Sequence, residues 1–107
     1  MTIAELIEEL REINQRLQKA YDLDDARVEV LARMTKISEE LGELSDEVLS
    51  TVSMQRKDKL GQFRTENVAK ELADVIVTVM ILGITLDIDV EQALVERLAQ
   101  LKNRKYV

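Results

Sequence analysis

The 107-residue sequence contains no proline and only three glycines, at Gly42, Gly61 and Gly83. Tight turns depend on these two residue types, because proline fixes φ and glycine readily adopts backbone angles that strain other residues. A chain with so few turn formers favours long helices joined by few connections. The sequence therefore predicts an all-α protein.

Hydrophobic periodicity divides the chain into four expected helices. In the first, apolar residues recur at steps of three and four from Ile3 to Leu17, which is the repeat of one helix face. Thr2 is the expected cap of the first helix, Asp24 or Asp25 is that of the second, and residues 87–89 are expected to cap the fourth. The expected helices span residues 3–20, 26–52, 65–86 and 90–102, and a polar segment, residues 53–62, lies between the second and the third.

The third expected helix contains the longest apolar run of the chain, VIVTVMILGI at residues 75–84. Its β-branched residues are also compatible with a buried strand. A helix is favoured because the run is long and follows the helical pattern NVAKELAD, residues 67–74. A helix that is apolar nearly all round needs cover on most of its faces. Three short partner helices cannot provide it, so the run predicts at least a dimer.

The second and fourth expected helices carry narrower apolar stripes. Such stripes are expected to face the core of a four-helix bundle. The residues expected to point inward are Met34, Ile37, Leu41, Leu44, Val48, Ala93, Leu94, Leu98 and Leu101.

Composition excludes several classes of site. Without cysteine the chain has no disulfide, zinc–thiolate site or thiol nucleophile, and without histidine it lacks the commonest general base and transition-metal ligand. Catalytic proton transfer would have to use carboxylate, lysine, tyrosine or water. The net charge of −6 opposes binding to the anionic backbone of nucleic acids.

The chain also shows no sign of a membrane or secretory role. Its acidic, amphipathic start, MTIAELIEELREI, is unlike a signal peptide, and the run at residues 75–84 is too short to span a bilayer. The length fits a single domain, and no repeat or linker divides it. We therefore expect one cytoplasmic domain over residues 1–107.

Two acidic motifs indicate a possible site. EELGEL, residues 39–44, contains three glutamates, and KELAD, residues 70–74, places Glu71 and Asp74 three apart. Taken singly, each is more typical of a solvated helix face. Together they read Glu-Glu-x-x-Glu followed by Glu-x-x-Asp on the next helix, without the balanced i,i+4 lysine partners of a solvated face. The combination therefore favours a shared site.

The two motifs would meet if the second and third helices packed antiparallel, about 8–10 Å apart. Residues three apart lie on neighbouring faces of a helix, so Glu40 and Glu43 would face Glu71 and Asp74. Four partly buried carboxylates repel one another and are poorly solvated. A hard divalent cation relieves that conflict, and Mg²⁺ is the best candidate, with Mn²⁺ as an alternative.

The stretches EELGE and ELAD resemble the paired motifs of the MazG-like family, the all-α nucleoside triphosphate pyrophosphohydrolases. The resemblance covers about residues 25–105. It implies a helical bundle that assembles as a dimer or a dimer of dimers. It also implies Mg²⁺-dependent cleavage of a nucleoside triphosphate between its α and β phosphates, giving the monophosphate and pyrophosphate.

The resemblance also implies a role for each position of the motifs. Glu39 would support the ligands or orient the attacking water, and without histidine a carboxylate such as Glu39 or Glu40 would have to orient or deprotonate that water. The metal ligands implied by the resemblance are Glu40, Glu43, Glu71 and Asp74. Basic residues of the last helix and tail would hold the phosphates, and here they are Arg97, Lys102, Arg104 and Lys105.

Two alternatives remain open at this point. A non-enzymatic helical interaction protein would use its acidic faces only for solubility. The second alternative is an enzyme of the same superfamily that acts on phosphoribosyl-ATP or dUTP. The sequence does not choose among these substrates, because base selectivity depends on the shape of a pocket formed partly by a neighbouring subunit.

Overall fold

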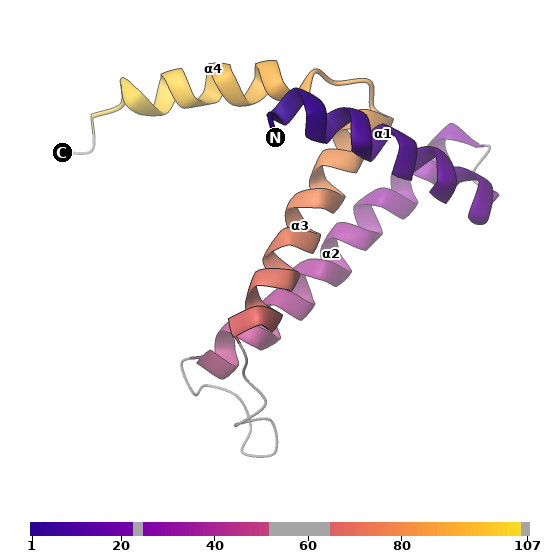
Figure 1. Cartoon of the computed structure of the whole chain (residues 1–107), viewed down its shortest axis with the longest axis horizontal. Helices are drawn as coiled ribbons and strands as arrows, with labels where there is room; N and C mark the ends of the chain where they lie inside the picture. Colours follow the sequence, from indigo (N-terminus) through magenta and orange to yellow (C-terminus); the bar gives the residue numbers. More distant parts are fainter. Residues whose placement is uncertain (23–24, 52–64, 106–107) are drawn as a thin grey trace.

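The computed structural model describes residues 1–22, 25–51 and 65–105, and these residues form four α-helices and no strand (Figure 1). The predicted all-α class is confirmed, and residues 75–84 are helical rather than a strand. Each observed helix end lies within one residue of the expected one. The helices are α1 (Ile3–Ala20), α2 (Ala26–Thr51), α3 (Thr65–Thr85) and α4 (Val90–Lys102).

Side-chain caps fix the starts of three helices. Oxygens of Thr2, Asp25 and Asp89 each accept a hydrogen bond from a backbone N–H in the first turn of α1, α2 and α4, at 3.1, 2.9 and 3.0 Å. These bonds satisfy N–H groups that have no partner within the helix. The alternative cap Asp24 and the expected polar segment, residues 53–62, lie outside the described residues.

The four helices form an open arrangement. α2 and α3 run antiparallel and lie side by side, α1 crosses the end of the pair where α2 begins, and α4 extends away from it (Figure 1). The Cα radius of gyration is 16.8 Å, whereas a compact chain of this length would have about 13 Å. A single chain therefore does not close into a compact four-helix bundle.

The buried core of one chain is small. Ile7 and Leu10 of α1 pack with Met80 and Ile81 of α3, and the exposed fraction of each is 9% or less. Other apolar side chains around this cluster are only partly buried. Among the described residues, the buried apolar core therefore lies where α1 contacts the C-terminal half of α3.

The expected burial of the apolar stripes is wrong for a single chain. In α3, Ile76 and Val79 are half exposed, and α4 has no buried residue because it extends away from the α2/α3 pair. α2 buries Glu29, Arg33 and Glu40 rather than the expected apolar stripe. Of the residues expected inward, Ile37, Leu44 and Leu101 are partly buried, and Met34, Leu41, Val48, Ala93, Leu94 and Leu98 are exposed.

The described helices differ from membrane-spanning ones. None of them combines the length and the hydropathy that crossing a bilayer requires. The cytoplasmic location stays a prediction.

The cap of α1 gives a first testable expectation. Replacing Thr2 by Ala removes the acceptor of the Glu5 N–H bond and should lower the free energy of unfolding by about 1 kcal/mol. Urea denaturation measures this change. The control is Thr35→Ala, at an exposed position within α2, which should leave stability unchanged or raise it slightly. Equal stabilities of the two variants would contradict a capping role for Thr2.

Candidate metal centre

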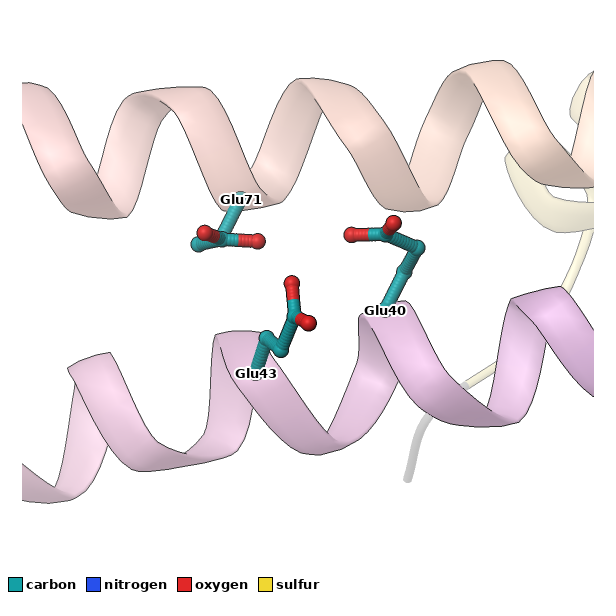
Figure 2. Close-up of side chains that lie close together, drawn as sticks. All are labelled: Glu40, Glu43 and Glu71. Atoms are coloured by element: carbon teal, nitrogen blue, oxygen red, sulfur yellow. The ribbon is translucent and has the colours of Figure 1, made fainter.

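Three of the predicted metal ligands meet across the seam between α2 and α3. Glu40 and Glu43 project from α2 toward Glu71 on α3 (Figure 2). One carboxylate oxygen from each residue lies within 4.8 Å of the other two. The antiparallel packing of the two helices therefore brings EELGEL and KELAD together, as their combination predicts.

The cluster leaves buried carboxylate oxygens without donors. Glu40 is 7% exposed, the side chain of Glu71 is 13% exposed, and the Oε2 atom of each is buried and accepts no hydrogen bond. A buried charged oxygen without a partner is unfavourable. A divalent cation would give both unpaired oxygens a partner. Glu43 is exposed, so one side of the cluster is open to water or phosphate. The donor set therefore fits Mg²⁺.

Electrostatic repulsion within the cluster is visible in Glu43. The charge of Glu40 is the main reason that the pKa of Glu43 lies above its ordinary value of 4.5, and desolvation and the charge of Glu71 add to the effect. Glu43 thus resists ionisation beside the charges of Glu40 and Glu71 when no cation is bound.

This shift predicts how the stability of the metal-free protein depends on pH. Because folded Glu43 keeps its proton to a higher pH than the unfolded chain, its contribution makes the unfolding free energy fall as pH rises above 4.5 through the raised pKa. The Glu43→Gln variant has no such group and should lose this component. Urea denaturation with a chelator present, repeated across that window, measures it. The same pH dependence in both proteins would contradict the repulsion.

A lysine on each helix lies beside the cluster. Lys36 Nζ is 3.3 Å from an oxygen of Glu40, and Lys70 Nζ is 3.5 Å from an oxygen of Glu71. The hydrogen bond to Glu40 is the main cause of the raised pKa of Lys36, and the charge of Glu71 is the main cause of the raised pKa of Lys70. The two lysine side chains therefore offset part of the negative charge of the carboxylate cluster.

These contacts correct one expectation about the motifs. Lys36 pairs with Glu40, and Lys70 pairs with Asp74 at 3.6 Å, and both pairs are spaced i,i+4. The expected lack of lysine partners is therefore wrong. What separates the site from a solvated face is the burial of Glu40 and the convergence of two helices on one point.

The remaining acidic residues lie beside the three-glutamate group rather than within it. Asp74 has a side chain that is 40% exposed, and Glu39 has one that is 56% exposed and 3.3 Å from Lys36. The ligand role of Asp74 and the water-orienting role of Glu39 stay predictions.

The predicted phosphate-binding residues are distant from the carboxylates within one chain. They lie on α4 and just after it, and are Arg97, Lys102, Arg104 and Lys105. Glu71 lies in the second turn of α3, and the helix continues for 14 residues, or about 21 Å. α4 then extends away from the pair (Figure 1). Their proposed role therefore requires a second copy of the chain.

A buried polar network that the sequence did not predict joins α1 and α2. Arg33 Nη2 donates to Asn14 Oδ1 at 2.8 Å and lies 3.8 Å from Glu29 Oε1, which accepts a 2.7 Å hydrogen bond from Gln18 Nε2. The available signal was positional: Asn14 follows Leu10 by four residues, so it falls on the buried face of α1.

Comparison of the chain with protein-family models, with curated proteins and with solved structures finds no match. The resemblance to the MazG-like family therefore rests on the two acidic motifs. What the site does has to be inferred from its own residues and their geometry.

Proposed function

We propose that this protein is a Mg²⁺-dependent nucleoside triphosphate pyrophosphohydrolase, which converts ribo- or deoxyribonucleoside triphosphates to the monophosphate and pyrophosphate. The supporting observation is the meeting of Glu40, Glu43 and Glu71, with unpaired buried oxygens on two of them. Such a cluster is unfavourable alone and favourable around a shared cation. Protein-bound Mg²⁺ usually keeps positions for substrate phosphates, so a triphosphate is a fitting substrate.

The residues around the cluster suggest a role for each in hydrolysis. Mg²⁺, when bound, would neutralise phosphate charge and lower the pKa of a water molecule. Of the two candidate bases, Glu39 is the one that is not needed as a cation ligand. Glu39 would take a proton from the water that cleaves the α–β anhydride. Lys36 and Lys70, beside the carboxylates, would offset charge on the phosphates.

Substrate hydrolysis with product identification tests this function. Ribo- and deoxyribonucleoside triphosphates, dUTP and phosphoribosyl-ATP would each be incubated with the protein and Mg²⁺, Mn²⁺ or a chelator. We expect pyrophosphate and the monophosphate in equal amounts, and only with a metal. Release of orthophosphate from the triphosphates would contradict cleavage between the α and β phosphates. No release from any compound would favour a non-enzymatic helical interaction protein.

We also propose that the working protein is a dimer or a dimer of dimers. Apolar side chains that are about half exposed in one chain occur on three helices, and burying them in a second copy would stabilise the assembly by about 25 cal/mol per Å². A second copy would also supply the basic residues of α4 that one chain keeps far from its carboxylates. Examples of these apolar residues are Met34, Leu41, Leu72, Ile76, Leu94 and Leu98.

Light scattering tests the assembly. At micromolar concentration we expect a mass of at least twice the 12.3 kDa of one chain. Leu98→Asp places a charge on the exposed face of α4, so it should shift the protein toward monomer without unfolding it. A wild-type protein that stays monomeric would contradict the proposal.

A further inference from the structure

A cavity of about 610 Å³ lies between α1, α2 and α3 and has walls of two kinds. Ile13 and Leu17 of α1 and Val77 and Ile81 of α3 form an apolar lining, and Arg33 of α2 adds a charged group. Ligand sites are typically mainly apolar cavities of this size with a few polar groups that fix orientation. The cavity thus has the character of a site for an organic group that is mainly apolar and carries a few polar atoms.

Arg33 carries a donor that nothing in the described chain satisfies. The residue is 8% exposed, and its Nη2 donates to Asn14, but its buried Nε has no acceptor. A guanidinium has five N–H donors and accepts no hydrogen bond, so this buried N–H needs an acceptor from another group or from a ligand. A void of about 40 Å³, lined by Arg33, Thr78 and other residues that also line the main cavity, has room for an acceptor atom beside it.

The cavity borders the carboxylate cluster. Lys36 and Glu39 line it, and Lys36 Nζ lies 3.3 Å from Glu40 Oε1, one of the cluster's own residues. A ligand that extends from the cavity past Lys36 therefore meets Glu40, one of the three glutamates. The positively charged Lys36 at that border suits a ligand whose uncharged part lies in the cavity and whose phosphates lie at the carboxylate cluster.

We infer that this cavity holds the nucleoside part of the triphosphate substrate, with the base between the apolar walls and an acceptor atom of the base bonded to Arg33 Nε. Arg33 then determines specificity among bases, because a base that offers no acceptor there leaves a buried charged donor unpaired. The inference rests on the proposed function and adds the location of the base and the residue that selects it.

Calorimetric binding of non-hydrolysable α,β-methylene triphosphates, with Mg²⁺ present, tests the inference on the full chain. Ala32 lines the cavity, so Ala32→Leu should fill part of it and weaken binding of these analogues at least about tenfold, or ~1.4 kcal/mol. Binding of Mg²⁺-pyrophosphate, which has no nucleoside, should be unchanged. Ala26→Leu, an exposed position of the same helix outside the cavity, should alter neither.

Two more variants keep the test decisive. If Ala32→Leu fails to fold, Ile13→Trp fills the cavity from a position that is 40% exposed. It should likewise weaken binding of the analogues and leave binding of Mg²⁺-pyrophosphate unchanged. Arg33→Lys should change the ranking of analogues that differ only in their base, because lysine keeps the charge and lacks the Nε donor.

The outcomes separate the two proposals. If the wild type binds the analogues and the filled variants bind them equally well, the nucleoside lies elsewhere, and the inference fails while the proposed function stands. If the wild type binds neither the analogues nor Mg²⁺-pyrophosphate, both fail.

Discussion

Replacing Glu71 by Gln is expected to reduce nucleotide hydrolysis to background and to abolish stabilisation of the protein by Mg²⁺. Glu71 supplies one of three converging carboxylates and has a buried oxygen without a donor, so the amide removes both the charge and a cation ligand. A cation that binds only the folded wild type stabilises it by about 2.7 kcal/mol at a hundred times its Kd. Melting curves with Mg²⁺ or a chelator, together with pyrophosphate release, measure both losses.

The metal-free Glu71→Gln protein should melt at the wild-type temperature or above it, because one of three repelling charges is gone. Two controls make the result specific. Glu9→Gln, on the exposed face of α1, should keep both activity and the Mg²⁺ effect. Glu39→Gln should lose activity and keep the Mg²⁺ effect, because Glu39 lies outside the three-glutamate group. Identical behaviour of Glu71→Gln and Glu9→Gln would refute a shared cation.

Replacing Leu10 by Ala should lower the free energy of unfolding by about 3–5 kcal/mol. Leu10 is 3% exposed and packs α1 against α3 in the small core of the chain. Urea denaturation at one fixed protein concentration measures the loss, since assembly would make stability depend on concentration. Glu12→Ala, exposed on the same helix, should change it by less than about 0.5 kcal/mol. A similarly small change for Leu10→Ala would contradict the docking of α1 on α3.

Local chemistry explains why the helices could be predicted well. The caps at Thr2, Asp25 and Asp89 are side-chain signals that act within one turn of the chain. The end of α3 is equally local: Asp87 takes a left-handed φ of 56°, and the Ile88 N–H bonds the Gly83 carbonyl. Such signals need no knowledge of which helix packs on which.

Packing could not be predicted in the same way. The periodicity of α2 places Met34, Leu41 and Val48 on one stripe, yet they are exposed, and α2 turns Arg33 and Glu40 inward instead. Arg33 is buried against Asn14 of α1, and Glu40 is buried facing Glu71 of α3, so the burial of both depends on contacts far away in sequence. The exposed stripe is what a chain that associates with copies of itself would carry.

The candidate site could be predicted only in part. Spacing predicted that the two motifs would meet, because residues three apart share a side of a helix, and Glu40, Glu43 and Glu71 do converge. Spacing did not reveal that Asp74 lies beside that group. The position of a carboxylate within a cluster depends on side-chain rotamers and on ion pairs such as that with Lys70.

Direct binding of Mn²⁺ tests the shared cation site most simply, since Mn²⁺ accepts the oxygen ligands of Mg²⁺ and the free ion has an electron paramagnetic resonance signal that binding diminishes. Titration of the wild-type protein should remove that signal, and excess Mg²⁺ should restore it. Glu40→Gln should bind Mn²⁺ far more weakly, because Glu40 is the most buried of the converging carboxylates. Wild-type protein that binds no Mn²⁺, or a Glu40→Gln variant that binds it as tightly as the wild type, would contradict a cation site formed by the three glutamates.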